Sequence, residues 1–262
     1  MESAGTFSGP ISQTPPAAEW MAIELPTVEE NLALDEALLE EAHEGLTVRP
    51  VVRTWMAEAP VVVVGSSSRI ADEVDEAACG ELGVRIVRRP SGGLTVLLGP
   101  GCLMWSVVVP HPSGSPPIDQ IHAGMLEPLR WQLNQAVADG GRTVERLGSS
   151  DLVLVDGSAQ RKCSGNALRV RRHAALYHGT LLDAFDIPLI SRVLRHPPRE
   201  PGYRARRPHG EFLANLGLGR SRLETLVRES FAAAPTRSVW PRDRVARLVR
   251  DRYADADWTR RL

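Results

Sequence analysis

Short runs of β-branched and apolar residues occupy the middle of the chain, and longer amphipathic segments flank them. The runs are typical of strands and predict them at 51–55, 61–65, 84–88, 94–98, 104–109, 152–155 and 174–182. A Thr27–Glu30 capping-box pattern followed by leucines near helical spacing predicts a helix from about 28 to 44. Further helices are predicted at 118–138, with an early interruption at Pro128, and at 187–195, 220–233 and 242–253.

The order of these elements predicts an α+β fold in which a mixed β-sheet is flanked by helices. Strands and helices do not alternate as they do in a doubly wound parallel sheet. Residues 1–22 are expected to be an unstructured tail, because their Gly, Ser, Thr, Pro and Ala bury too little apolar surface to offset chain entropy. Residues 23–262 have a suitable length for a single domain.

The composition excludes several classes of protein. The formal net charge of −1 gives no overall attraction to nucleic acid or to a membrane surface. The chain shows neither a signal-peptide pattern nor a run of about 18 apolar residues, so we expect no membrane association. Three cysteines at wide spacing fit neither a disulfide framework nor a zinc ribbon, which favours a reducing, cytoplasmic location.

Metal and nucleic-acid sites are also disfavoured. Cys163, His173 and His178 lack a recurrent ligand spacing, so no metal site is predicted. The arginine clusters RVRR at 169–172 and RARR at 204–207 have few aromatic residues interleaved with them. They are interpreted as a solvated charged loop or as a docking surface for an acidic protein, ahead of RNA binding.

Lys162 is the main candidate for chemistry. It is the one lysine among 31 basic side chains, and the others are arginines. This bias indicates a position where a planar guanidinium cannot replace a compact ammonium, the alternative being that one lysine escaped the bias by chance. Gly157 and Gly165 bracket the lysine, and small residues let a ligand approach the backbone closely. An ammonium there would stabilise negative charge between an acyl carbonyl and a phosphate.

The second candidate is the sequence RRPSGGLTV at 88–96, between two predicted strands. Pro-Ser-Gly-Gly alone is an ordinary turn. Arg88 and Arg89 precede it, and consecutive glycine amides can face an anion, so the segment could bind a carboxylate or a phosphate.

Five segments in order resemble the motifs of the lipoate–protein ligase A family, which is related to biotin–protein ligases and octanoyltransferases: RRPSGGLTV, LGPGCLMWS, SSDLVLVDG, RKCSGNALR and YHGTLL. Flanking matches extend the resemblance to about residues 25–235: NLALDEALLEE before these segments and PGYRARRPHGEFLANL after them.

The resemblance implies one catalytic domain over 23–262, with the mixed sheet shared by biotin ligases and class II aminoacyl-tRNA synthetases. It implies that ATP, with magnesium, activates lipoate or octanoate as an acyl-adenylate, and that a lysine of a lipoyl-domain or glycine-cleavage H-type protein accepts the acyl group. Lys162 matches the lysine that contacts the acyl carbonyl and the phosphate. The other positions that match binding residues are Arg88, Arg89, Ser91, Gly92, Gly93, Asp151, Gly165, Asn166, His178, Gly179 and Thr180.

Two departures from the family pattern keep alternatives open. Leu94 replaces a third glycine, where a bulky side chain could narrow the ligand turn or alter the choice of acyl chain. Only about 50 residues follow the last motif, so we expect no full C-terminal accessory domain, and a small accessory protein could support adenylation.

The alternative enzyme is an octanoyl or lipoyl transferase that accepts its acyl group from an acyl-carrier protein through a thioester on Cys163 or Cys102. A strand at 161–165 would place Cys163 and Lys162 on opposite faces and make the thiol structural. A non-catalytic acyl-binding protein is the third possibility.

Overall fold

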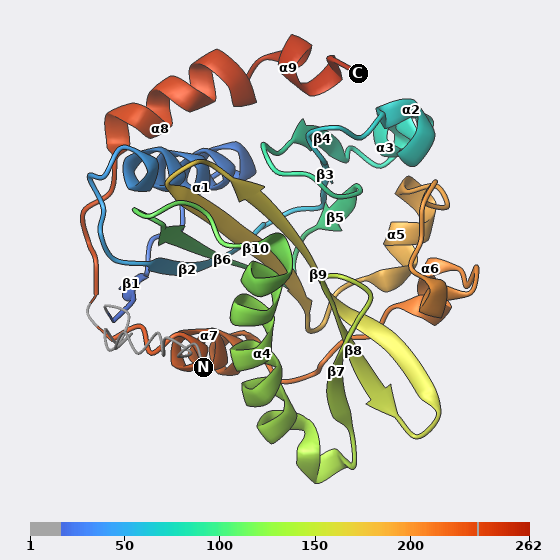
Figure 1. Ribbon diagram of the computed structural model, residues 1–262. Coiled ribbons are helices and arrows are strands. Elements are labelled where there is room, and N and C mark those ends of the chain that lie inside the picture. Colours follow the sequence, from blue (N-terminus) through green and yellow to red (C-terminus); the bar gives the residue numbers. More distant parts are fainter. Residues whose placement is uncertain (1–16, 235) are drawn as a thin grey trace, which may run out of the picture.

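Two β-sheets carry the fold, which a computed structural model describes for residues 17–234 and 236–262 (Figure 1). The larger sheet has the strand order β1-β2-β6-β10-β9-β8-β7 and the smaller has the order β4-β3-β5. The β1–β2 and β3–β4 pairs are parallel, and the others are antiparallel. The prediction of a mixed sheet flanked by helices is therefore confirmed.

The larger sheet contains β1 (Glu19–Met21), β2 (Val51–Met56), β6 (Cys102–Pro110), β7 (Thr143–Leu147), β8 (Asp151–Asp156), β9 (Ala159–Val170) and β10 (Ala174–Leu182). The smaller sheet contains β3 (Val61–Val64), β4 (Arg85–Arg88) and β5 (Val96–Leu98).

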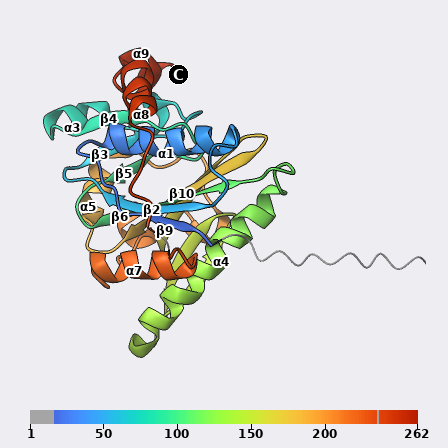
Figure 2. The same cartoon turned by 90° about the vertical axis from the view of Figure 1, so that its left-hand side faces the viewer.

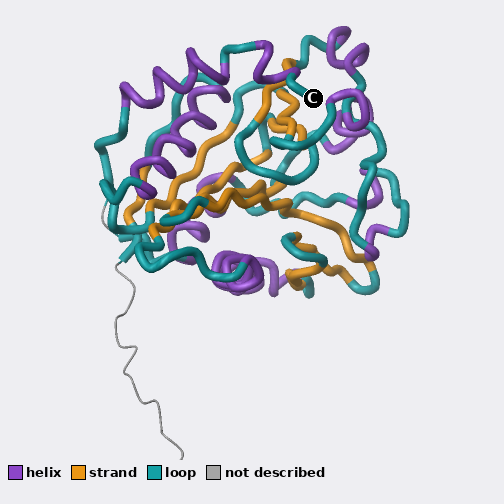
Figure 3. Tube along the Cα trace, turned by 45° about the horizontal axis from the view of Figure 1, so that its top comes forward, coloured by secondary structure: helices purple, strands orange, loops and turns teal. Residues whose placement is uncertain are grey.

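Helices cover both faces of the larger sheet (Figure 2). On one face lies α1 (Val28–His43), with α8 (Arg242–Leu248) packed against it, and on the other lie α4 (Ile118–Val137) and α7 (Arg220–Ser230). A hydrophobic cluster fills the space on each side of the sheet. The tube in Figure 3 shows the same helix–sheet–helix layering. Shorter helices connect the main elements: α2 (Ile70–Glu73), α3 (Glu76–Glu81), α5 (Ile187–Val193) and α6 (His209–Phe212). The short helix α9 (Ala256–Arg260) follows α8.

Buried polar contacts fix α1 on the sheet. Its N-terminus has the predicted capping box between Thr27 and Glu30. In its middle, Asp35 Oδ1 lies 2.7 Å from Arg53 Nη1 on β2 and accepts a hydrogen bond of 2.8 Å from Ser106 Oγ on β6. A buried charge is tolerated when it is paired and hydrogen-bonded, so this network fixes where α1 crosses the sheet.

Some local predictions were wrong. Pro128 lies inside α4 without interrupting it, because the proline φ suits a helix and packing of the apolar face offsets one lost hydrogen bond. Strand β1 begins at Glu19, inside the predicted 1–22 tail, and pairs with β2; residues 1–16 of that tail lie outside the described part of the chain. Strands β7 and β9 were missed, because polar residues and glycines dilute their pattern.

Within the described residues, no helix combines the length and the apolar character that crossing a membrane requires.

Candidate active site

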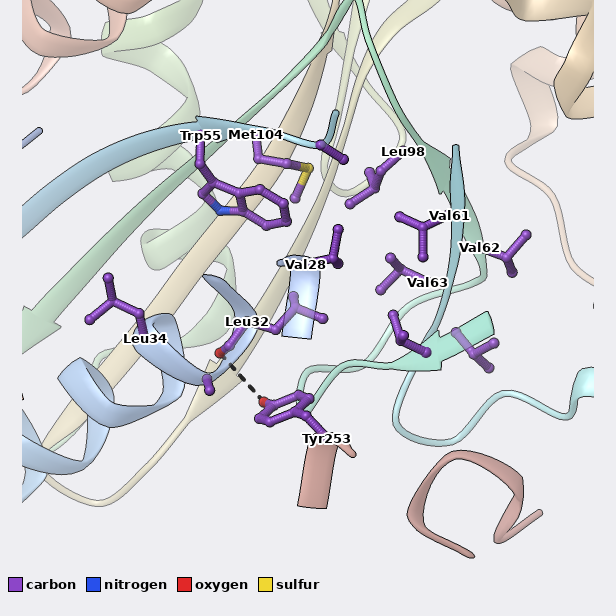
Figure 4. Close-up of a cluster of buried hydrophobic side chains, with 14 of the residues drawn as sticks. Val28, Leu32, Leu34, Trp55, Val61, Val62, Val63, Leu98, Met104 and Tyr253 are labelled. Carbon is purple, nitrogen blue, oxygen red and sulfur yellow. Dashed lines mark hydrogen bonds between the residues drawn. The ribbon is translucent and has the colours of Figure 1, made fainter. Parts of the chain in front are cut away.

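A cavity of about 600 Å³ lies where the β8–β9 hairpin, the turn after β4 and the segment 195–213 meet. This volume is typical of a small-molecule site. Figure 4 shows how part of its apolar wall joins the buried cluster beneath α1, where Leu32, Val63, Leu98 and Met104 lie together. The apolar lining includes Leu32, Val63, Val96, Leu98, Met104, Leu182, Ile190 and Leu194. Polar lining includes Asp151, Lys162, Ser164, Asn166, His178, Thr180, Arg204 and His209.

Lys162 reaches this cavity from β9. A bulge opposite Leu152 and Val153 shifts the pairing, so that Lys162 pairs with Val153 while Ser164 pairs with Leu152. A side chain three residues along a regular strand would point to the other face, yet a Cβ built on Gly165 would lie only 2.8 Å from both Cε and Nζ of Lys162. The lysine therefore folds back over Gly165 and needs the space that the missing side chain leaves.

Asp151 holds the lysine ammonium. Its Oδ1 lies 2.8 Å from Lys162 Nζ, and its Oδ2 accepts a hydrogen bond of 2.8 Å from the hydroxyl of Tyr203. Burial, followed by the charge of Asp151, raises the pKa of Tyr203 well above its ordinary value, so the phenol stays a donor. The carboxylate is satisfied from two sides and keeps the lysine at the cavity wall.

The two arginines before the turn have different positions from those expected. Arg89 lines the cavity but is 5% exposed, and its guanidinium donates to the carbonyls of Val63, Gly92 and Leu94 and to Ser91 Oγ. Burial lowers its pKa to about 10, a value at which it stays charged at neutral pH. Arg89 therefore holds the backbone of the turn in place, and its N–H donors are not free to bind an anion.

The expectation that Arg88 lies along the ligand is not met. Its side chain is fully buried and does not line the cavity. Nη1 donates to the carbonyls of Gly65 and Ser68, and Nε donates to the carbonyl of Thr259 on α9. The reason is strand alternation, because consecutive residues at the end of β4 point to opposite faces. Arg88 links the turn to the C-terminal segment.

The turn requires glycine at position 93 but has room for a side chain at position 92. Gly93 has φ +87°, and a Cβ there would lie 2.9 Å from Arg89 Nη2. Its carbonyl oxygen would lie 1.8 Å from a Cβ on Gly65, so the turn packs directly on that backbone. A Cβ on Gly92 would meet nothing within 4 Å, and Leu94, which follows the pair, lines the cavity.

His178 on β10 completes the wall behind the turn. Its Nε2 lies 2.6 Å from Ser91 Oγ, which also accepts a hydrogen bond from Arg89 Nε at 3.1 Å. Burial lowers the pKa of His178 to about 4, so the ring is neutral at pH 7. Arg89 can only donate, so Ser91 Oγ accepts from it, and the direction of the Ser91–His178 hydrogen bond depends on the imidazole tautomer. Ser91 itself lies behind the wall, since it does not line the cavity.

The remaining expected residues meet along β9 and β10. Asn166 and Gly179 are paired, and a Cβ on Gly179 would lie 1.7 Å from Asn166 Oδ1, so the amide lies directly across the glycine. Asn166 Nδ2 donates to the carbonyl of Ser150 at 2.7 Å. Thr180 Oγ1 accepts a hydrogen bond of 3.3 Å from the amide of Gly165. Gly165, Asn166, Gly179 and Thr180 all line the cavity.

None of the three thiols lines the cavity. Cys163 is fully buried within the cluster beneath α4, on the opposite face from Lys162, and its Sγ donates to the carbonyl of Leu152. Cys102 is fully buried in the other cluster. Burial raises the pKa of both thiols to about 12. Neither thiol has the exposure or the low pKa of a nucleophile.

Sequence reasoning missed several residues at or beside the cavity. Arg204 lines the cavity and belongs to the 204–207 cluster that was interpreted as a charged loop, and Glu73 lines it from the end of α2. Tyr203 does not line the cavity but donates to the cavity residue Asp151. The Glu73 carboxylate accepts a hydrogen bond of 2.7 Å from the amide of Thr95 and raises the pKa of nearby Arg89, opposing the effect of burial. The tyrosine within 201–207 was the available signal, because a tyrosine that packs its ring against the protein usually hydrogen-bonds through its hydroxyl. Among the described residues, no group of three or more His, Cys, Asp or Glu could hold a metal ion.

Comparison with known proteins places these features in a family. Residues 27–217 match the model of the lipoyl protein ligase A/B catalytic domain. The octanoyltransferase LipM of Carboxydothermus hydrogenoformans is 28% identical over 253 residues, which cover 87% of this chain and 93% of the relative.

Solved structures show the same fold. The bi-partite lipoate protein ligase of Thermoplasma acidophilum, described together with its E2 lipoyl domain, superposes with a TM-score of 0.77 at 21% identity, covering 93% of this chain and 96% of that one. A lipoate-protein ligase A bound with ATP gives 0.74 at 20% identity, with 93% and 98% covered. Since the family match spans most of the chain, this protein belongs to the lipoyl protein ligase A/B catalytic domain family and is an enzyme of the lipoate–protein ligase and octanoyltransferase type.

Proposed function

We propose that the enzyme uses ATP to activate the carboxylate of lipoate or octanoate and transfers the acyl group to a lysine of a lipoyl-domain or glycine-cleavage H-type protein. The observation that carries this proposal is the pairing of a cavity-facing Lys162 with a cavity wall that contains no thiol. An enzyme without a thiol at the site must either receive an acyl group that is already activated or activate the free acid in the cavity. A fixed ammonium beside an apolar wall suits activation in the cavity, because it can stabilise the negative charge that develops there.

The residues divide the work between binding and charge stabilisation. Leu98, Met104 and Leu182 give the hydrocarbon chain an apolar surface, and burying it there is favourable. As a carboxylate oxygen attacks the α-phosphorus, the bond to the β-phosphate oxygen breaks and pyrophosphate leaves, while Lys162 stabilises the charge on the reacting oxygens. The acceptor amine then attacks the acyl carbonyl, AMP leaves, and the amine loses a proton.

Asp151 and the turn position these groups. Asp151 would keep Lys162 charged and aimed, and Arg89 would hold the backbone of Gly92 and Leu94 beside the ligand. Magnesium usually takes one or two carboxylates together with phosphate oxygens and water. Asp151, the carboxylate beside Lys162, is already engaged by Lys162 and Tyr203, so the nucleotide phosphates and water would hold the ion, with Asp151 as at most one protein ligand. The ion would supply charge neutralisation to the nucleotide.

A second candidate is acyl transfer from the thioester of an acyl-carrier protein. The LipM relative is named an octanoyltransferase, which favours acyl transfer over activation of a free acid. The thiols of Cys163 and Cys102 do not, because both lie in the hydrophobic core, so the acyl group would have to pass from the carrier to the acceptor without an enzyme thioester.

The deciding experiment measures ATP–pyrophosphate exchange with lipoate and octanoate, and in parallel acyl transfer from an octanoylated acyl-carrier protein. Exchange that depends on the acid supports the ligase, and transfer from the carrier alone would refute it.

The Lys162→Arg variant tests the central residue. It should lose about 10²–10³ in exchange rate, nearly as much as Lys162→Ala, because a guanidinium cannot fold back over Gly165 as a point charge. Arg161→Lys, one position along β9 and outside the cavity, is the matched control.

A further inference from the structure

Arg204 is a buried guanidinium in the cavity wall that the roles above do not use. It ends the short 3-10 turn Gly202–Arg204 and is 5% exposed. Its Nε donates to the carbonyl of Arg207 at 3.1 Å and lies 3.5 Å from Glu200 Oε2. Its Nη2 is buried with no hydrogen-bond partner in the described part of the chain. The group lies over the ring of Phe212, another cavity residue, at 4.6 Å.

The surrounding loop fixes this arginine in place. Ala205 and Arg206 both have positive φ, 51° and 59°, a conformation that is costly for residues with a side chain. Reciprocal bonds maintain it, because Arg207 Nε donates back to the carbonyl of Arg204 while the amide of Arg206 donates to Glu200. Burying a charged guanidinium with an unpaired N–H donor costs free energy. A ligand that pairs with Arg204 therefore explains its constrained position better than packing alone does.

The neighbouring charges favour an anion. The positive side chains of the cavity wall are Arg89, Lys162, Arg195, Arg199 and Arg204, against the carboxylates of Glu73, Asp151 and Glu200.

All three carboxylates already have partners. Glu73 accepts from the amide of Thr95. Asp151 is engaged by Lys162 and Tyr203, and Glu200 accepts from the amide of Arg206 and contacts His196 Nε2 at 3.1 Å. His209, also in this wall, has its pKa lowered to about 4 by burial and by the charges of Arg204, His196 and Lys162. The wall therefore keeps a surplus of positive charge.

We propose that Arg204 and Lys162 form a subsite for a phosphate group of the acyl donor system. A guanidinium suits phosphate oxygens because its donors lie in a fixed plane, and the ammonium adds a point charge. Under the proposed function, on which this inference rests, the group is the pyrophosphate portion of ATP. The phosphate of the phosphopantetheine arm of an acyl-carrier protein has the same chemistry and is the other possible source.

Pyrophosphate alone is the probe, and calorimetry on the full chain without acyl substrate is the measurement. Arg204→Met keeps an unbranched side chain over Phe212 and removes the charge, and it should weaken pyrophosphate binding about tenfold to a hundredfold. Arg206→Met is the matched control, on the same loop but exposed and outside the cavity, and should change binding by less than about threefold.

Thermal unfolding without ligand separates binding from a structural role. Arg204→Met should melt at the wild-type temperature or above it, because an under-bonded buried charge has been replaced by an apolar side chain. A variant that melts lower and still binds pyrophosphate as the wild type does would overturn the subsite. Equal losses of binding in Arg204→Met and Arg206→Met would also overturn it, because they would indicate unspecific charge attraction.

Competition identifies the source of the phosphate. Displacement of pyrophosphate by ATP supports the subsite and assigns it to the nucleotide, displacement by phosphopantetheine supports it and assigns it to a carrier, and displacement by neither overturns it. Because binding is measured without turnover, a failure of the subsite can be distinguished from a failure of the proposed reaction. Pyrophosphate binding through Arg204 without any ATP–pyrophosphate exchange would support the subsite and refute the ligase. Exchange without pyrophosphate binding through Arg204 would support the ligase and refute the subsite.

Discussion

Gly165→Ala isolates the position of the Lys162 ammonium from its charge. A Cβ at residue 165 would lie 2.8 Å from Cε and Nζ of Lys162, whereas ordinary contacts begin near 3.4 Å. The end of the lysine must therefore move by about 0.6 Å or more, which changes its 2.8 Å contact with Asp151. Since a misplacement of about 1 Å at a reacting centre can cost about 100-fold, we expect acyl-adenylate formation to fall between about tenfold and 100-fold.

The stability of this variant should change little. The displaced atoms are the end of a flexible side chain, and the backbone of Gly165 has no positive φ. The Lys162–Asp151 pair is partly exposed, so its weakening costs no more than about 1 kcal/mol, and replacing glycine by alanine offsets part of that. Single-turnover acyl-adenylate formation and thermal unfolding are the two measurements.

Gly124→Ala is the control for this experiment. Gly124 lies exposed on α4, where an added Cβ meets nothing within 4 Å, so activity should stay at the wild-type level. Wild-type activity in Gly165→Ala would refute the reasoning, because it would show that the chemistry tolerates a displaced ammonium. A loss of activity that merely follows a lower melting temperature would refute it as well.

Three further predictions address the thiol, the turn and the buried imidazole. Cys163→Ser should keep most acyl transfer per folded molecule while the melting temperature falls, because a hydroxyl replaces a thiol in an apolar core at a cost of about 1–3 kcal/mol; loss of transfer with an intact fold by circular dichroism would support a thioester instead. Leu94→Gly should strengthen or broaden acyl binding in calorimetry, since the Leu94 side chain lines the cavity; unchanged affinity would show that it packs away from the ligand. The pKa of His178 is lowered from 6.5 to about 4, so the unfolded chain binds more protons between these values, and stability should fall as pH decreases through this range, by about 3 kcal/mol in total. Urea unfolding at several pH values should show a shallower dependence in His178→Gln, and identical slopes would contradict the assignment.

Local patterns in the sequence were sufficient for most of the regular elements. The capping box at Thr27 and the run that forms β10 identified their elements with nearly correct bounds, because capping and alternation act over a few residues. Strand β9 was missed, although it carries Lys162. Its glycines and polar residues follow neither period, and pairing with β8 and β10 on its two sides holds it in the sheet.

The single lysine could be chosen as a candidate from the sequence because a compositional bias marks a position without reference to neighbours. Which side chains share the cavity was decided by tertiary structure. Strand alternation turns Arg89 toward the ligand turn and Arg88 toward α9, and a bulge places Lys162 above Gly165. These outcomes depend on register and on pairing between distant segments, which one local pattern cannot specify. For the same reason Arg204, interpreted from the sequence as part of a solvated charged loop, became a buried wall residue only when the loop closed over Phe212.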